Sequence, residues 1–301
     1  MSFRSGFVAV IGRPNVGKTY LINAMVGEQI AITSFQPQTT RQVIRGIVTR
    51  EHGQIVLVDT PGVHKPKTLL GERLNEMTRA AYSDVDVSML CFPADEAVGP
   101  GDRLLATDIG ALRCRKVAVL TKTDKAGKGE IMQRLLALQE LATDCGFVWD
   151  HIVPVSSMAE ENLDALTSVL IECLPEGPAL YPDNEVTDAS DVDRIRDLIR
   201  QAALERVREE LPHSIAVEVD EWQVGEGKQR DTIFASLIVE RDSQKPILIG
   251  KGGAMIKEIG TTARLSLEKL LGKSVHLELK VKVLQEWQKD PKALKRLGFD
   301  G

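Results

Sequence analysis

Three polar clusters follow apolar runs in the first half of the chain, and their residue types suit phosphate and metal-ion chemistry. The first cluster, residues 12–19, reads Gly-Arg-Pro-Asn-Val-Gly-Lys-Thr. Its two glycines allow backbone N–H groups to turn towards an anion, and Lys18 can neutralise phosphate charge. The hydroxyl of Thr19 can ligate Mg²⁺. An apolar run before this segment and an amphipathic one after it predict a strand, a phosphate loop and a helix.

The second cluster comprises Asp59, Thr60, Pro61 and Gly62, and it ends the apolar run at residues 54–58. A carboxylate at a strand end can hold the shell of a magnesium ion, and the N–H of Gly62 can sense a γ-phosphate. A strand that ends in a plain Pro-Gly turn is the alternative. Beside a phosphate loop, we favour the functional interpretation.

The third cluster, Thr-Lys-Thr-Asp at residues 121–124, suits recognition of guanine. The carboxylate of Asp124 can accept both Watson-Crick-edge donors of guanine, while the stem of Lys122 packs along the purine. Adenine presents no such donor pair, so the site would select guanine. Ser156, Ser157 and Met158 follow a further apolar run, and their backbone could meet the guanine carbonyl.

These clusters need a scaffold that brings strand ends together. Apolar runs alternate with helical patterns through residue 174, which predicts an α/β domain with a mostly parallel sheet. The runs at residues 42–50 and 54–59 are joined by a short turn and predict a hairpin, hence one antiparallel edge strand. Ligands of such sheets bind at the carboxyl ends of the strands, where all three clusters fall.

A Pro- and Gly-rich stretch after residue 174 predicts a linker, and a smaller α+β domain follows it. Its pattern indicates a long helix from Val192, strands at 215–221 and 232–240, a helix near residue 253 and a last strand at 275–284. The expected division is a first domain at 1–175, a linker at 176–188, a second domain at 189–285 and a basic tail at 286–301.

Gly250, Lys251, Gly252 and Gly253 form a Gly-x-x-Gly turn in the second domain. Such a turn lets a nucleotide backbone approach closely, with Lys251 opposing a phosphate and Lys257 six residues further on. A helix-capping turn is the plainer alternative. Residues 244–301 hold twelve lysines and arginines against six acidic residues, although the whole chain has a net charge of −5. This asymmetry favours an anionic partner for the C-terminal part of the chain. An RNA bound at the turn would be single-stranded, because a duplex hides the base edges.

The order of these clusters resembles that of the phosphate-loop GTPases. The sequence Gln-Thr-Thr-Arg at residues 38–41 is similar to the switch I signature of the branch that acts in translation and ribosome assembly. Residues 63–71 and 239–253 resemble the Era family, whose members join a GTPase domain to a KH domain. The resemblance covers essentially the whole chain.

The resemblance implies GTP/GDP and Mg²⁺ as cofactors, with K⁺ near Asn15 as a further hypothesis. It also implies the 3′ end of small-subunit ribosomal RNA as the partner and a role in assembling the small ribosomal subunit. We expect a monomeric protein, and a cytoplasmic one, since no apolar segment is long enough to span a membrane. Peripheral contact with the inner face of the cell membrane stays open. The expected site residues are catalytic Asn15, Lys18, Thr40 and Gly62; metal-binding Thr19, Thr40 and Asp59; nucleotide-binding Gly12, Asn15, Val16, Gly17, Lys18, Thr19, Tyr20, Thr121, Lys122, Asp124, Ser156, Ser157 and Met158; and RNA-binding Gly250, Lys251, Gly252, Gly253 and Lys257.

Three features depart from what GTPases usually carry. The Era family usually has Asn where Thr121 stands and a Ser-Ala pair in place of the Ser-Ser-Met segment at residues 156–158. Many regulatory GTPases place a water-polarising glutamine after the Asp-x-x-Gly turn, but Val63 stands there, so slow intrinsic turnover is expected. The chief alternative function is an RNA-binding clamp in which GTP hydrolysis is incidental. A GTPase of another branch, acting on tRNA modification or the large subunit, fits less well.

Composition places few further limits. With 301 residues, 43% of them apolar and 27% charged, the chain can build two cores. Its four cysteines lie far apart in the sequence and are expected to be buried, reduced thiols. No apolar segment approaches the roughly 18 residues that a membrane helix needs. Trp287 in the tail could stack on a base or dock in the core, and the sequence does not distinguish the two.

Overall fold

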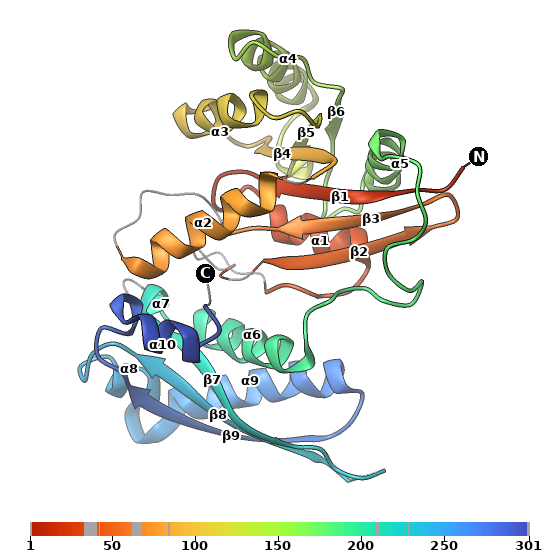
Figure 1. Ribbon diagram of the computed structural model, residues 1–301. Coiled ribbons are helices and arrows are strands. Elements are labelled where there is room, and N and C mark those ends of the chain that lie inside the picture. Colours follow the sequence, from red (N-terminus) through yellow and green to blue (C-terminus); the bar gives the residue numbers. More distant parts are fainter. Residues whose placement is uncertain are drawn as a thin grey trace. The chain divides into compact units, whose positions relative to one another are not determined.

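The computed structural model describes residues 2–32, 41, 43–61, 68–83, 85–208, 211–227 and 229–299. Two units appear in it (Figure 1). The first contains a six-stranded sheet and continues to Asp188, and the second contains a three-stranded sheet. Among the described residues, no helix is long and apolar enough to cross a membrane.

The sheet of the first unit has the order β2-β3-β1-β4-β5-β6. Five strands run parallel, and only β2 is antiparallel, paired with β3 at the sheet edge. This arrangement confirms the predicted mostly parallel sheet with one antiparallel edge strand. The strands are β1 (Arg4–Ile11), β2 (Ile44–Arg50), β3 (Gly53–Asp59), β4 (Val87–Pro93), β5 (Arg115–Thr121) and β6 (His151–Pro154).

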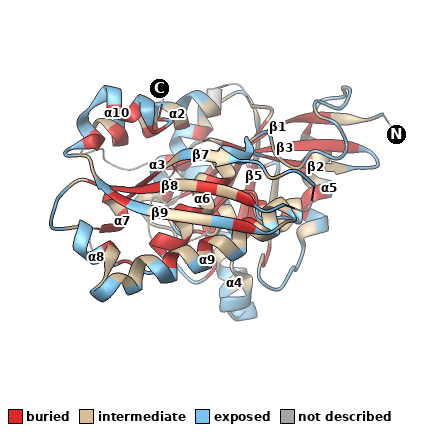
Figure 2. Ribbon diagram, turned by 90° about the horizontal axis from the view of Figure 1, so that it is seen from below, coloured by how far each residue is buried: buried red, intermediate tan, exposed pale blue. Residues whose placement is uncertain are grey.

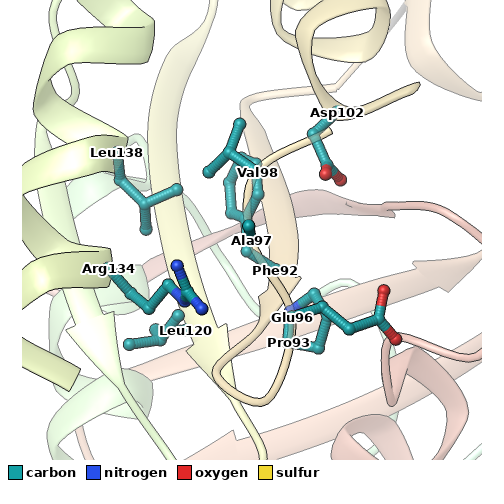
Figure 3. A pocket seen from close by; sticks show the side chains of 9 residues that line it. All are labelled: Phe92, Pro93, Glu96, Ala97, Val98, Asp102, Leu120, Arg134 and Leu138. Carbon is teal, nitrogen blue, oxygen red and sulfur yellow. The ribbon is translucent and has the colours of Figure 1, made fainter. Parts of the chain in front are cut away.

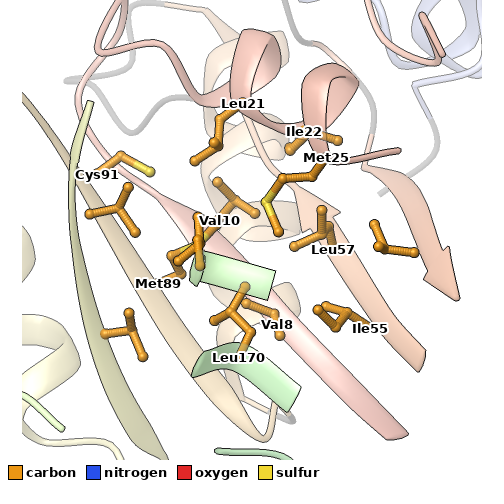
Figure 4. Close-up of a cluster of buried hydrophobic side chains, with 14 of the residues drawn as sticks. Val8, Val10, Leu21, Ile22, Met25, Ile55, Leu57, Met89, Cys91 and Leu170 are labelled. Carbon is orange, nitrogen blue, oxygen red and sulfur yellow. The ribbon is translucent and has the colours of Figure 1, made fainter. Parts of the chain in front are cut away.

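Side chains of β1 alternate between two cores, which is how one strand supports helices on both faces of the sheet. Val8 and Val10 pack with residues of α1 (Lys18–Val26) and α5 (Leu163–Cys173), as Figure 4 shows for part of this cluster. Ala9 and Ile11 pack on the opposite face with α3 (Pro100–Gly110) and α4 (Lys128–Asp144). Each fully buried Leu or Ile contributes roughly 1.5–3 kcal/mol to stability. A further helix, α2, spans Leu69–Ser83.

Residues 176–188, which the sequence predicts as a linker, are hydrogen-bonded to the first unit. Gln54 is completely buried, and its carboxamide oxygen accepts from the backbone N–H groups of Leu180 (2.7 Å) and Tyr181 (2.9 Å). Further along, the N–H of Ile47 donates to the carbonyl of Val186 (2.9 Å). The chain is therefore held along the edge of the sheet until shortly before the second unit begins.

The second unit is a three-stranded sheet with the order β7-β8-β9 and helices packed on one face. Strands β7 and β8 are antiparallel, whereas β8 and β9 are parallel and joined through two helices. The buried part of β8 is visible in Figure 2. The elements are α6 (Asp191–Leu204), α7 (Leu211–Ser214), β7 (Ala216–Gln223), β8 (Asp231–Val239), α8 (Lys245–Ile249), the 3₁₀ turn η2 (Lys251–Gly253), α9 (Ala254–Leu271) and β9 (Val275–Val283).

A buried carboxylate fixes one end of this sheet. Asp231 has no exposed surface, and its Oδ1 lies 2.7 Å from the ammonium of Lys273 and accepts from the N–H of Gly225 at 2.8 Å. The indole N–H of Trp222 donates to its Oδ2 at 3.0 Å. Burial alone would raise the pKa of Asp231, but these donors together hold that pKa below its usual value.

The tail of the chain closes the core of the second unit. After the 3₁₀ turn η3 (Trp287–Lys289) comes helix α10 (Pro291–Arg296). Trp287 is completely buried, its indole N–H donates to the carbonyl of Ser214 (3.0 Å), and its ring stacks on Phe299 with centroids 5.9 Å apart. Of the two predicted roles for Trp287, docking in the core is therefore the one observed.

The four cysteines are free, as predicted, but they are not all buried. Cys91 is buried, whereas Cys114, Cys145 and Cys173 are only partly so. The prediction of uniformly buried thiols is thus wrong for three positions. Cys114 lies in the loop before β5, and Cys145 directly follows α4.

Candidate functional site

The loop between β1 and α1 has the backbone conformation of an anion cradle. Gly12, Asn15 and Gly17 all have positive φ angles, of 156°, 63° and 100°. A left-handed Gly17 precedes α1 and has no side chain with which to cap the helix, so the first turn of α1 directs its backbone N–H groups towards the loop, where an anion could bind. Val16 is buried within the loop, and Tyr20 is 36% exposed on the first turn of the helix.

Lys18 lies inside this loop with only 8% of its surface exposed. Its ammonium donates to the carbonyls of Gly12 and Arg13, both at 2.9 Å. Burial lowers the pKa of Lys18, and the charge of nearby Asp59 opposes that shift. An ammonium has three protons, so with two donated to these carbonyls Lys18 could also donate a hydrogen bond to a phosphate.

The predicted magnesium ligands meet at the ends of α1 and β3. The hydroxyl of Thr19 donates to Oδ2 of Asp59 at 3.1 Å, and Asp59 is completely buried. A hydroxyl and a carboxylate at this separation are oxygen ligands of the kind that Mg²⁺ takes. The other two predicted residues of this region, Thr40 and Gly62, lie outside the described residues.

Thr121 joins the predicted guanine loop to the phosphate loop. It ends β5, it is 1% exposed, and its hydroxyl lies 2.5 Å from the carbonyl of Val16 and 3.1 Å from that of Phe92. The single hydroxyl proton can be donated to one of these carbonyls at a time. Thr121 therefore links the two loops at the position where the family usually has an asparagine.

Asp124 and Ser156, both predicted to contact guanine, are hydrogen-bonded to each other. The hydroxyl of Ser156 donates to Oδ1 of Asp124 at 2.6 Å and accepts from the N–H of Ala159 at 3.0 Å. Lys122 has a left-handed backbone, with φ 56°. Ser157 is half-buried and Met158 is 74% exposed. The sequence assigned only backbone roles to residues 156–158, and the contact of the Ser156 hydroxyl with Asp124 was missed.

The glycine loop of the second unit is exposed and connects α8 to α9. Gly250, Gly252 and Gly253 have φ angles of 72°, 60° and 83°. The loop closes on itself through a hydrogen bond from the N–H of Gly253 to the carbonyl of Gly250 at 3.2 Å. Lys251 and Lys257 are both exposed beside it. Backbone that any larger residue would strain is thus presented to solvent next to two cations.

Comparison with known proteins identifies both units. A family described as "50S ribosome-binding GTPase" matches residues 7–122, and one described as "KH domain" matches residues 210–288. GTPase Era of Mycolicibacterium smegmatis is 54% identical over 302 residues, covering 99% of each chain. The chain belongs to the Era family of GTPases. GTPase Era of Mycobacterium tuberculosis is 52% identical, again over 99% of each chain.

Solved Era structures share the fold of this chain throughout. An Era variant from Aquifex aeolicus bound to GDP·AlF₄⁻ superposes with a TM-score of 0.94 at 33% identity, covering 99% of this chain and all of that one. The same values hold for an Era in complex with MgGDPNP and nucleotides 1506–1542 of 16S ribosomal RNA. The Era resemblance read from the sequence is therefore confirmed, and so is the order of a GTPase domain followed by a KH domain.

Proposed function

We propose that this chain binds GTP and GDP with Mg²⁺, hydrolyses GTP, and binds the 3′ end of small-subunit ribosomal RNA to assist assembly of the small subunit. The observation that carries the proposal is the convergence of Lys18, the Thr19–Asp59 pair and Asp124 at the strand ends of one sheet. Its support comes from the Era relative that holds MgGDPNP and 16S ribosomal RNA together.

The described residues fit a magnesium-bound guanine nucleotide. Lys18 and the loop N–H groups would hold the phosphates, and Thr19 with Asp59 would hold the metal ion. Magnesium supplies positive charge that offsets the charge on the transferring phosphoryl group. Asp124, oriented by Ser156, would accept from the guanine base. We assign Gly12, Asn15, Val16, Gly17 and Tyr20 to the same site, and Thr40 and Gly62 on the sequence alone.

We propose K⁺ as a further catalytic charge, held with the help of Asn15. The left-handed Asn15 lies between Gly12 and Gly17 in the phosphate loop, and Val63 cannot polarise water. GTP turnover should then be faster in K⁺ than in Na⁺, and Asn15→Ala should remove the difference. Equal rates of the wild-type protein in the two salts would contradict the proposal.

The RNA site that we propose is the glycine loop, with Gly250, Lys251, Gly252, Gly253 and Lys257. Its glycines leave room for a nucleotide backbone to approach closely, and its cations can oppose phosphates. The RNA must be single-stranded, because a duplex would hide the base edges. The buried position of Trp287 argues against base stacking by that residue.

The test is the binding of a fluorescent single-stranded RNA, copied from the 3′ end of small-subunit ribosomal RNA, at one fixed salt concentration. Tighter binding with a GTP analogue than with GDP would support a nucleotide-controlled switch. Equal binding would favour the alternative of a clamp with incidental hydrolysis. The absence of binding in every nucleotide state would refute the RNA half of the proposal.

A charge reversal separates the RNA site from the nucleotide site. Lys251→Glu should weaken RNA binding several-fold and leave GTP affinity unchanged, because its side chain is exposed in the second unit. Lys269→Glu is the matched control, since Lys269 is exposed near the far end of α9, the helix that follows the loop. Similar losses in both variants would point to net charge and against a site at the loop.

We further propose that the domains extend over 1–175 and 189–285, with the segment 176–188 between them and the tail 286–301 after them. The proposed working form is a cytoplasmic monomer, and sedimentation analysis would test its mass. Peripheral contact with the inner membrane face is the alternative location. Co-sedimentation with anionic vesicles at physiological salt would support that alternative.

A further inference from the structure

The segment that joins β4 to the first turn of α3 contacts both loops of the nucleotide site. Asp95 lies 3.8 Å from the ammonium of Lys122 in the guanine loop. Glu96 lies 3.0 Å, and Asp102 2.8 Å, from the guanidinium of Arg13 in the phosphate loop. Three acidic residues of this segment thus contact the two loops that would hold the base and the phosphates of a nucleotide.

Asp102 is the most buried of these three carboxylates. It is 1% exposed, and both of its oxygens are used: Oδ1 accepts from Nε of Arg13, and Oδ2 accepts from the N–H of Gly99 at 2.8 Å. Glu96 is 51% exposed, so its ion pair is screened by water and contributes little. Asp102 and Glu96 line one side of a small hollow, across from Arg134 of α4 (Figure 3).

The side chain of Arg13 packs against Gly101 on the first turn of α3. A Cβ atom added to Gly101 would lie 2.9 Å from Cδ of Arg13, closer than real contacts allow. The stem of Arg13 therefore lies against the first turn of α3, and its guanidinium is directed to the carboxylate of Asp102. Nothing in the motif of a phosphate loop requires this arginine, because it contributes only its backbone to the cradle.

That backbone holds the residue which meets the phosphates. The carbonyls of Arg13 and of its neighbour Gly12 both accept hydrogen bonds from Lys18. A shift of Arg13 would move these carbonyls and release the ammonium. The guanidinium of Arg13 is anchored by Asp102, and the carbonyl of Arg13 in turn orients the ammonium of Lys18.

We propose that Asp102 is a positioning residue for nucleotide binding, acting through Arg13 to hold the phosphate loop ready for the phosphates of GTP and GDP. The inference rests on the proposed role of residues 12–19 as the phosphate site. The competing explanation is a purely structural one, in which Asp102 only caps α3. The two differ in whether the effect passes through Arg13 and in whether it depends on the phosphates of the ligand.

Asp102→Asn separates these explanations. The carboxamide oxygen can still accept from the N–H of Gly99, but its NH₂ group would face Arg13, which has only donors. We expect release of a fluorescent GDP analogue to become about tenfold faster, on the scale of one lost charged hydrogen bond. Arg13→Gln should give a similar increase, and the double variant no more than either single one. Asp108→Asn, on an exposed position of α3, is the control.

Guanosine provides the second measurement, because it lacks the phosphates that the loop would hold. Its affinity should be unchanged in Asp102→Asn, whereas a general distortion of the site would weaken guanosine and GDP alike. Additive effects in the double variant, parallel losses for both ligands, or GDP release at the wild-type rate would overturn the proposal. If Asp102→Asn does not fold, Arg13→Gln alone tests the proposal, and an unchanged rate of GDP release from that variant would refute it. Failure of the wild-type protein to bind any guanine nucleotide would instead refute the phosphate site.

Discussion

Replacement of Thr121 by valine removes one hydroxyl and preserves the shape of the side chain. In the structure that hydroxyl is the group of β5 that reaches the carbonyl of Val16, at 2.5 Å. Thr121 is 1% exposed and Val16 is 2% exposed, so water cannot easily replace the lost donor. The perturbation therefore tests whether a threonine can replace the loop-joining asparagine that is usual in the Era family.

The expected magnitude follows from the one proton that the hydroxyl carries. Although two carbonyls lie within reach, only one hydrogen bond is lost, and leaving a buried carbonyl unsatisfied costs about 1–3 kcal/mol. We expect the free energy of unfolding of the first unit to fall by about 2 kcal/mol. If the phosphate loop must be re-formed on binding, the same amount would weaken nucleotide affinity up to roughly 30-fold.

Urea unfolding and the release of a fluorescent GDP analogue measure the two effects. Thr123→Val is the matched control, because it makes the same change two residues along, at a half-buried position in the same loop. The reasoning fails if Thr121→Val and the control have the same stability and the same GDP release rate. A loss of stability without faster GDP release would show that the hydrogen bond from Thr121 to Val16 stabilises the fold but does not hold the phosphate loop in its nucleotide-binding conformation.

Three further results are expected. Lys18→Ala should abolish GTP binding in an equilibrium titration while the chain stays folded; retained micromolar binding would contradict its role. Trp287→Ala should lower the free energy of unfolding by about 3–5 kcal/mol, the usual cost of emptying a buried tryptophan site; a loss below about 1 kcal/mol would contradict the docked tail. Because the pKa of Asp231 is held below its usual value, its ion pair with Lys273 stabilises the fold above about pH 4 and is lost as the pH falls through the lower folded value. Acid unfolding curves should therefore be flatter for Asp231→Asn than for the wild-type protein in that range, and identical slopes would exclude the contribution.

The features that were predicted correctly depend on short stretches of sequence, such as an apolar run followed by a polar cluster. Apolar runs followed by polar clusters gave the strands and the position of Lys18 and Asp59, because a strand end fixes where the next loop lies. The hairpin of β2 and β3 was visible for the same reason. A Gly-x-x-Gly turn between two helical patterns placed Lys251.

The parts that could not be predicted depend on contacts between residues far apart in the chain. Arg13 meets Asp102 across 89 positions, and neither residue is distinctive alone. A charged residue inside the phosphate loop and a carboxylate in the first turn of a Pro-led helix were the only signals. Trp287 had two equal interpretations, and only the carbonyl of Ser214 and the ring of Phe299 decide between them.

The buried tail also sets an order of events during synthesis of the protein. All six strands of the first sheet have been made once Pro154 has been added, so that unit can begin to fold while the ribosome is still translating. The second unit cannot complete its core until Trp287 and Phe299 have both left the exit tunnel. Since domains generally fold as units in the order of their synthesis, a nascent chain that stalls before Trp287 would carry a formed nucleotide-binding unit and an unfinished RNA-binding one.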